Sequence, residues 1–228
     1  VGGKKNNWFY SFDVSNVHFV SLSTELVVDI LDVTNETRYG FNYPDLTGWQ
    51  HDWLIDDLEK DASNAATDWL VVYSHHPFYC SNVDDDCRGE HASAVREGVP
   101  GHEDAGLEET LVKYGADLYL SGHVHMYERM LPAYKNKTDS SWSSDDNRTM
   151  TKPGAPVHIV SGSGGGPEGT EGFNEDDILD FSVTRIADYS YSKVIVYNET
   201  HLKFEQWGTA MSDASPDGVI VDWMWIVK

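Results

Sequence analysis

An α/β fold, with helices packed against a sheet of parallel strands, is the fold class that the sequence predicts. Two apolar runs typical of buried strands, Trp69 to Tyr73 and Leu118 to Leu120, are separated by a stretch with helical spacing. Histidine follows each run closely, at His75 and at His123. Because buried parallel strands deliver their last side chains to the carboxyl edge of the sheet, we expect these histidines to meet there.

The N-terminal part of the chain is expected to form two strands and one helix. Trp8 to Val14 and Val17 to Ser23 alternate or run apolar between turn residues, which predicts the strands. Val27 to Pro44 has no firm period and is expected to be a surface excursion. Thr47-Gly48-Trp49-Gln50 fits a capping box, which predicts a helix that ends near Lys60.

A second helix is predicted between the two histidine-bearing strands. Asp104 is expected to cap it, and Gly115 is expected to end it. Strands that alternate with helices at these spacings favour parallel neighbours in one sheet.

The C-terminal part is expected to be loop and strand within the same domain, which we place at 1–228. Lys135 to Lys152 is polar and predicts a loop, and Ala155 to Ser161 predicts a strand. Gly162 to Gly172 is rich in glycine but lacks the helix start or Gly-Lys-Ser of a phosphate cradle, so we expect a mobile loop. The tail, 181–228, alternates like a β-meander.

The amino-acid composition limits the functions that this chain can have. At 228 residues with 40% hydrophobic residues, the chain can bury the core of one globular domain. A net charge of −22 argues against nucleic-acid and anionic-membrane partners, which need a basic face. No apolar run approaches the roughly 20 residues of a transmembrane segment. The same charge repels phosphate esters at long range, so metal charge would have to dominate at a phosphate site.

A metal site is predicted at His75, His123 and His125. In Gly122-His123-Val124-His125 the two histidines are one residue apart and share one side of an extended segment. Glycine at the first position is expected to allow the sharp turn and close approach that a ligand requires. By contrast, His18 and His158 lie within apolar runs and are expected to be hydrogen-bonded core residues.

Cysteines and sequons point to an extracytosolic chain. Cys80 and Cys87 bracket a short acidic loop, which leaves either a disulfide or two free thiols open. Glycosylation sequons favour the disulfide and a secreted, cell-surface or lysosomal/vacuolar location. Their asparagines are Asn35, Asn136, Asn147 and Asn198.

Several segments resemble a known family. Gly122-His123-Val124-His125 with the following Met126-Tyr127-Glu128-Arg129 resembles the last metal motif of the calcineurin-like metallophosphoesterases, and its Tyr-Glu-Arg tail resembles the purple acid phosphatase branch. His75-His76-Pro77-Phe78 resembles the preceding motif, with His75 as the ligand. The similarity runs nearly end to end and is greatest to the secreted enzymes of animals and protists. It implies a β-sandwich flanked by helices on both faces.

The resemblance also implies that other parts of the site lie elsewhere. The family's first three motifs read D-x-G, G-D-x-x-Y and G-N-H-[DE], and the sequence has no G-D-x-x-Y or G-N-H. Asp104-Ala105-Gly106 spells D-x-G but follows no strand. We therefore expect this chain to be the C-terminal half of a catalytic domain whose N-terminal half, a partner segment, supplies the remaining aspartates, tyrosine and asparagine.

The chemistry implied by the resemblance is metal-assisted hydrolysis of phosphate monoesters at acid pH. His125 would bind Fe3+, and His75 with His123 would bind a divalent ion, Zn2+, Mn2+ or Fe2+. His91, in a stretch similar to the family's H-x-S-x-V-R, is the expected substrate contact, ahead of His76 and His102.

Glu128 and Arg129 are expected to support the His125 loop rather than to take part in chemistry. The alternative function is a catalytically inactive phosphatase-like module, with a structural or binding role and association with other cell-surface proteins. Hydrolysis of phosphodiesters or nucleotides on the same site is a third reading.

Overall fold

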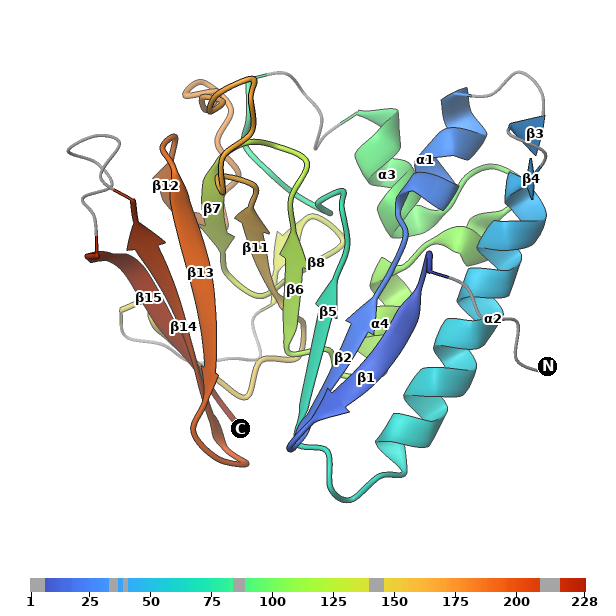
Figure 1. The fold of residues 1–228 in the computed structure, drawn as a ribbon, viewed down its shortest axis with the longest axis horizontal. Helices are drawn as coiled ribbons and strands as arrows, with labels where there is room; N and C mark the ends of the chain where they lie inside the picture. The colour runs from blue at the N-terminus through green and yellow to red at the C-terminus, as the bar shows by residue number, and fades with distance from the viewer. Residues whose placement is uncertain (1–6, 33–36, 39–40, 84–88, 140–145, 210–217) are drawn as a thin grey trace.

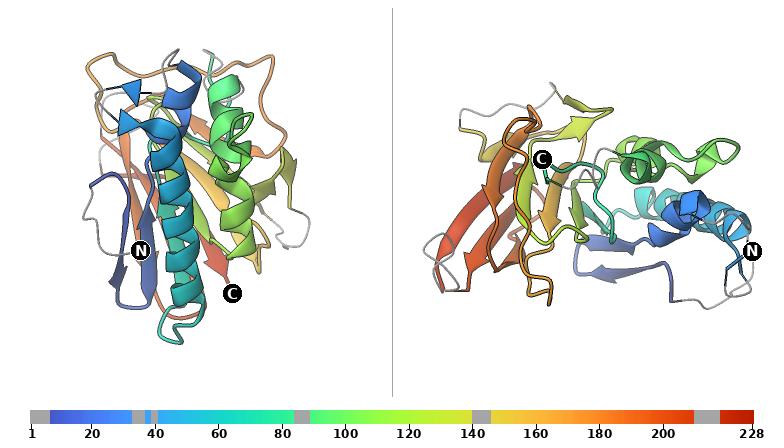
Figure 2. Two further views of the ribbon diagram at one scale, coloured as in Figure 1. Left: turned by 90° about the vertical axis from the view of Figure 1, so that its right-hand side faces the viewer. Right: turned by 90° about the horizontal axis from the view of Figure 1, so that it is seen from above.

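The structure is a computed structural model that describes residues 7–32, 37–38, 41–83, 89–139, 146–209 and 218–228. Two sheets face one another, and helices cover the outer face of the larger sheet (Figure 1). Seen from above, the order of layers is small sheet, large sheet, helices (Figure 2). The predicted α/β class is confirmed. Within the described ranges helices flank one face of this sandwich, whereas the resemblance implied helices on both faces.

The large sheet has the order β1-β2-β5-β6-β11-β7-β12. Its four central strands, β2, β5, β6 and β11, are parallel as predicted, and the flanking strands run antiparallel to their neighbours. The bounds are Tyr10–Val14 for β1, Val17–Ser21 for β2, Trp69–Tyr73 for β5, Leu118–Ser121 for β6, Tyr127–Met130 for β7, Val157–Ser161 for β11 and Ser182–Ile186 for β12.

The small sheet has the order β10-β15-β14-β13. The bounds are Thr149–Thr151 for β10, Ser190–Val196 for β13, His201–Gly208 for β14 and Ile220–Val227 for β15. The expected meander is therefore β13 to β15, whereas β12, at the start of the tail, pairs with β7 in the large sheet. The polar stretch expected to be only loop contributes β10 and one strand of a short hairpin, β8 (Ala133–Tyr134) with β9 (Lys137–Thr138).

The helices are α1 (Glu25–Asp32), α2 (Tyr43–Ala62), α3 (Glu90–Glu97) and α4 (Glu108–Lys113). The expectation of a surface excursion over 27–44 is wrong, because this stretch holds most of α1, a short hairpin of β3 (Thr37–Arg38) with β4 (Phe41–Asn42), and the start of α2.

The predicted capping box is also wrong. Because α2 begins at Tyr43, Thr47 and Gln50 lie inside the helix. The Thr47 hydroxyl donates to the Leu26 carbonyl over 3.0 Å, and the Gln50 Oε1 atom accepts the Ser23 N–H over 2.8 Å. These polar groups therefore join α2 to the segment around the start of α1 instead of capping α2.

The start of α4 differs from the prediction, and its end agrees. Asp104 lies in a separate 3-10 turn, Glu103–Ala105, and the residue that precedes α4 is Leu107. Gly115 follows the helix with a φ of +71°, the left-handed conformation that glycine adopts readily after a helix end.

Two cores explain why the central strands read as continuous apolar runs. In β5, Trp69 and Val71 belong to the core between the two sheets, whereas Leu70 and Val72 belong to the core under the helices. Successive side chains of a strand point to opposite faces, so a strand covered on both sides needs apolar residues at every position. This double burial fixes the direction in which β5 and β6 emerge at the sheet edge.

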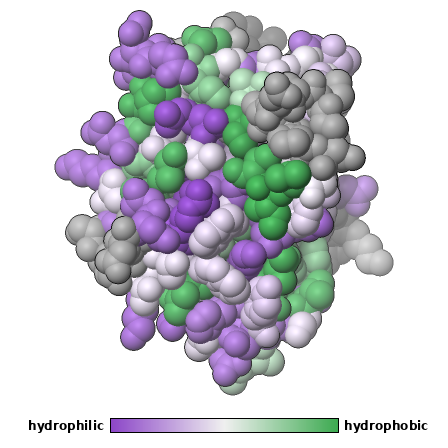
Figure 3. Space-filling view, turned by 90° about the vertical axis from the view of Figure 1, so that its left-hand side faces the viewer, coloured by the Kyte–Doolittle hydropathy of each residue, from purple (hydrophilic) through white to green (hydrophobic). Residues whose placement is uncertain are grey.

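The outer face of the small sheet mixes hydrophilic and hydrophobic side chains (Figure 3). Lys193 lies 3.8 Å from the Trp207 ring centroid, and Arg148 lies 4.8 Å from that of Trp223. Cationic side chains therefore cover part of the aromatic surface of this face. Among the described residues, no helix is both long and apolar enough to cross a membrane.

Candidate metal centre

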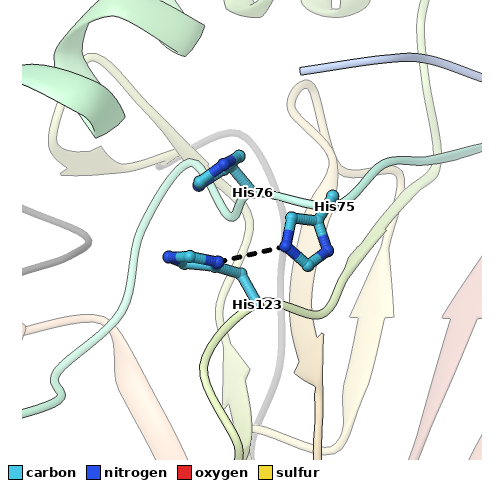
Figure 4. A group of neighbouring side chains, drawn as sticks. All are labelled: His75, His76 and His123. Carbon is cyan, nitrogen blue, oxygen red and sulfur yellow. Dashed lines mark hydrogen bonds between the residues drawn. The ribbon is translucent and has the colours of Figure 1, made fainter. Parts of the chain in front are cut away.

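His75 and His123 meet at the carboxyl edge of the large sheet. They follow β5 and β6, which are adjacent parallel strands. The backbone N–H of Gly122 donates to the His75 carbonyl over 3.0 Å, which joins the two strand ends. The His123 Nδ1 and His75 Nε2 atoms are 3.1 Å apart (Figure 4). The two rings therefore share one small volume, although 48 positions separate them in the sequence.

His76 is the third member of this group. One ring nitrogen from each of His75, His76 and His123 lies within 4.8 Å of the others. An ion with tetrahedral bonds of about 2.0–2.1 Å to nitrogen holds its ligand atoms about 3.3 Å apart. The 3.1 Å between His75 and His123 is close to this spacing, so the imidazoles present fit a divalent metal ion.

His125 lies beside this group rather than in it. Its ring is partly buried, and its Nδ1 atom is 4.0 Å from the Glu168 carboxylate. After burial and repulsion from His76, the electrostatic effect of His125 also lowers the pKa of His75. His125 is thus near enough to act on the same region while it occupies a separate position. The assignment of His125 as a ligand of a second ion stays a prediction.

The turn into the site is made by His123 and not by the glycine before it. His123 has a φ of +64°, whereas Gly122 is not among the residues with positive φ. The expectation that Gly122 allows the sharp turn and a close approach is therefore wrong, since a Cβ atom there would lie at an ordinary 4.0 Å from the His75 carbonyl oxygen. A left-handed histidine carries backbone strain, and such strain is concentrated at functional sites, where the surrounding structure holds it.

Sequence reasoning missed Glu25, in the first turn of α1. Its Oε1 atom lies 3.0 Å from His76 Nε2 and 3.7 Å from His75 Nε2. The hydrogen bond from His76 lowers the pKa of Glu25. Partial burial, followed by repulsion from His76, lowers the pKa of His75, which favours the neutral imidazole that metals bind. The available signal was that Glu25 follows a predicted strand, β2, which neighbours β5.

The candidate substrate contacts lie at different distances from the histidine group. His91 is the second residue of α3, and its ring centroid is 6.5 Å from that of His76, at the border of the group. His102 precedes the 3-10 turn and exchanges backbone hydrogen bonds with Val99. The histidine group does not include His102.

The two histidines expected to be core residues are buried and hydrogen-bonded. His18 is 6% exposed, with Nδ1 2.6 Å from Asp13 and Nε2 3.0 Å from Asp57, and the Asp57 bond raises its pKa to about 9. His158 is 1% exposed, and burial lowers its pKa to about 4. Its Nε2 atom donates to the Ala133 carbonyl over 3.1 Å. Both expectations are confirmed.

Glu128 and Arg129 hold structure together, as expected, but not at the His125 turn. The buried Glu128 carboxylate accepts the Ser81 N–H over 2.8 Å and the Ser182 hydroxyl over 2.6 Å. The Arg129 Nε atom donates to Asp222 of the small sheet over 2.6 Å. They therefore support the loop after His75 and the contact between the sheets.

The covalent features are only partly within the described residues. Cys80 is buried, but Cys87 lies outside them, so the Cys80–Cys87 disulfide stays a prediction. Asn35 also lies outside them. The other sequon asparagines are exposed, where a glycan can be attached: Asn136, Asn147 and Asn198.

Comparison with known families identifies the class of protein to which the layered fold and the histidine edge belong. The family model for calcineurin-like phosphoesterases matches residues 2–127, and the model for the C-terminal part of iron/zinc purple acid phosphatase-like proteins matches residues 155–222. This chain belongs to the calcineurin-like phosphoesterase family, with a C-terminal part of the purple acid phosphatase type. The description of the second family model refers to iron and zinc.

Curated relatives are acid phosphatases. Human acid phosphatase type 7 is 36% identical over 99% of this chain and 47% of its own length. An acid phosphatase of Aspergillus ficuum is 30% identical over 90% of this chain and 36% of its own length. The chain thus spans about half the length of the animal relative and about a third of the fungal one.

Solved structures share the fold. A purple acid phosphatase from yellow lupin (Lupinus luteus) seeds superposes with a TM-score of 0.66 at 22% identity, over 96% of this chain and 32% of that one. A Plasmodium protein described as the anchor in the inner membrane complex superposes with a TM-score of 0.58 at 18% identity, over 97% of this chain and 54% of that one. The fold alone therefore does not fix the function.

Proposed function

We propose that this chain carries the histidine part of a binuclear metal centre that hydrolyses phosphate monoesters at acid pH. The observation that supports this most directly is the 3.1 Å approach of His75 Nε2 to His123 Nδ1 at the sheet edge. It occurs in a chain whose curated relatives are acid phosphatases. Imidazole suits iron, zinc and manganese, so the donor set agrees with the metals that the family uses.

In this proposal His75 and His123 bind the divalent ion, Zn2+, Mn2+ or Fe2+, and His125 binds Fe3+. When bound, the ions supply Lewis acidity toward the phosphate oxygens and lower the pKa of a coordinated water. Glu25 orients His76 beside this centre, and burial lowers the pKa of His75, which favours the neutral imidazole that a metal ion binds.

His91 binds the phosphate group of the substrate. Its position near the start of α3, with its ring 6.5 Å from that of His76, puts it at the border of the histidine group. A ring N–H there would donate to a phosphate oxygen, which matters because the net charge of −22 repels phosphate at longer range.

The remaining ligands come from an N-terminal half of the same domain. Histidines alone offer no carboxylate bridge between two cations, and their mutual repulsion at short separation is large without one. The chain spans about half the length of human acid phosphatase type 7, which agrees with a site completed by an upstream segment.

The proposed setting is extracytosolic: secreted, at the cell surface, or lysosomal/vacuolar. Exposed sequon asparagines and a disulfide between Cys80 and Cys87 fit an oxidising, glycosylating compartment. Association with other cell-surface proteins belongs to the same setting and awaits a pull-down from intact cells.

The experiment is hydrolysis of an aryl phosphate by the intact, metal-loaded protein near pH 5. We expect turnover by the wild type and none by His123→Ala. His201→Ala is the matched control, because His201 is an exposed histidine on β14, in the small sheet. A folded, metal-loaded wild type without turnover would favour the inactive structural module, and a preference for a bis-aryl phosphate would favour phosphodiesters.

A further inference from the structure

The glycine-rich segment, defined here as 162–174, packs against the turn that carries His125. The Gly162 N–H donates to the Met126 carbonyl over 3.0 Å, and a Cβ atom at Gly162 would lie only 1.9 Å from the Val124 carbonyl oxygen. The expectation of a mobile loop over 162–172 therefore did not include the packing of this segment against the His125 turn. They allow two backbone segments to touch at the candidate site.

Glu171, in this segment, forms hydrogen bonds with both the backbone N–H and the backbone carbonyl of His125. The Glu171 Oε1 atom accepts the His125 N–H over 2.8 Å, and the Glu171 N–H donates to the His125 carbonyl over 3.0 Å. A carboxylate that accepts a backbone N–H makes a charge-assisted hydrogen bond, which is stronger than a neutral one. This bond and the neutral backbone bond to the His125 carbonyl together fix the position of the peptide units on both sides of the His125 side chain.

The same segment reaches the loop that follows His75. The Glu171 Oε2 atom accepts the side-chain amide of Asn82 over 3.4 Å, and the Asn174 N–H donates to the Ser81 carbonyl over 2.9 Å. Asn82 also forms a bridge with Phe173. One short segment therefore joins the two loops that carry the proposed ligands of both ions.

The turn around His125 needs this support because its own hydrogen bonds are short-range. The N–H of Val124 donates to Gly122, and that of Met126 donates to Val124, each spanning only two residues. Bonds of this kind close three-residue turns and constrain them weakly. The bond that the structure gives to the His125 N–H comes from Glu171.

We propose that Glu171 is a positioning residue for the metal centre, which holds His125 in the geometry that its ion requires. This inference rests on the proposed function. Removal of a group that orients a metal ligand typically lowers metal affinity about 10–100-fold. Because Glu171 bonds both backbone groups of His125 directly, and reaches the loop after His75 only through the longer bond to Asn82, the ion held by His125 should weaken more than the ion held by His75 and His123.

Three variants of the intact protein test this role. Glu171→Ala removes the acceptor of the His125 N–H, Glu171→Gln keeps an oxygen at the same place, and Glu175→Ala is the control at an exposed glutamate nearby. Amide hydrogen exchange of His125 is measured in the metal-free protein, and titration with Fe3+ and Zn2+ gives the affinity of each site. If Glu171→Ala fails to fold, Glu171→Asp, whose shorter side chain withdraws the carboxylate, is measured in its place.

We expect Glu171→Ala to speed exchange at the His125 amide and to weaken one metal site about tenfold or more, with a smaller loss at the other. Glu171→Gln, which keeps one acceptor without the charge, should lie between Glu171→Ala and wild type, and Glu175→Ala should behave like wild type. Equal affinities of Glu171→Ala and wild type at both sites would overturn the inference while the proposed function stands. Equal loss at both sites would also overturn it, because that pattern indicates general loosening. Wild type that binds no metal would overturn the proposed function and the role of Glu171 with it.

Discussion

Gly166 lies against the imidazole of His125 so closely that a side chain has no room there. A Cβ atom at this position would be 2.6 Å from the His125 Cε1 atom. The ring can swing aside, so the collision displaces the candidate ligand without blocking the backbone. A side chain at position 166 should therefore disturb the position of the His125 ring more than the stability of the fold.

We expect Gly166→Ala to lower phosphatase activity about 100-fold, because a displacement of about 1 Å at a reacting centre can cost that much. Its free energy of unfolding should change by less than about 1 kcal/mol. Gly164→Ala is the matched control, since a Cβ there meets no atom within 4 Å. Assays and denaturant unfolding of both variants check this, and equal activities would show that the His125 ring position does not matter.

His18 is a titrating group in the core, away from the histidine group. Its hydrogen bond to Asp57 raises its pKa from 6.5 to about 9. When folding raises the pKa of a histidine, the full stabilisation is present at pH values below the pKa of the unfolded state. This stabilisation is lost as the pH rises through the pKa of the folded state. The pH window of this loss is therefore about 6.5 to 9.

We expect the free energy of unfolding to fall by up to about 3 kcal/mol from pH 6.5 to above pH 9, since one unit of pKa shift corresponds to about 1.4 kcal/mol. His18→Gln, which does not titrate, should flatten this part of the pH profile. Denaturant unfolding at a series of pH values measures it. An equally steep profile in the variant would mean that another group is responsible.

Part of the site could be predicted from the sequence because its residues stand directly after apolar runs. His75 and His123 needed only the rule that parallel strands end at one edge. Glu25, His76 and Glu171 could not be assigned their contacts in this way. Their contributions depend on how α1 and the glycine-rich segment fold back over the sheet edge, which local pattern does not encode.

Between elements, a buried ion pair joins the two sheets. Arg129 on β7 and Asp222 on β15 are each 1% exposed, and Asp222 also accepts the Tyr127 hydroxyl over 2.8 Å and Arg148 over 3.2 Å. Removing one partner of a buried pair leaves an uncompensated charge, which is more costly than the pair itself is stabilising.

Asp222→Ala should lower the free energy of unfolding by about 3–5 kcal/mol, because Arg129 would stay buried without its carboxylate. Lys135→Met removes the 3.6 Å pair with Glu109, in which both side chains are exposed, and should cost less than about 1 kcal/mol. Urea unfolding of both variants gives the comparison. Similar losses would indicate that the pair between the sheets contributes no more than a surface pair.

Elements with strong apolar patterns could be predicted, and those defined by tertiary contacts could not. β5 and β6 are covered on both faces, so their sequences carry the signal directly. The helix α3 reads as a polar stretch, although Val95 packs into the core under the helices. Thr47 and Gln50 matched a cap by spacing alone, but their side chains serve contacts to Leu26 and Ser23.

At the scale of the whole molecule, the disulfide and the glycans indicate the cellular compartment in which the protein matures. Mass spectrometry of the native protein should find a Cys80–Cys87 linked peptide before reduction. It should also find glycan on at least one sequon among Asn35, Asn136, Asn147 and Asn198. A reduced, unmodified native chain would contradict the extracytosolic proposal.

The metal content of the intact protein, measured together with its turnover of an aryl phosphate, tests the central claim most directly. We expect wild type to hold a pair of metal ions and to be active near pH 5. His123→Ala should lose the divalent ion, keep the ion assigned to His125, and show no turnover. A wild type without metal, or a His123→Ala variant that keeps both ions and full activity, would contradict the assignment of this histidine edge as a phosphatase metal centre.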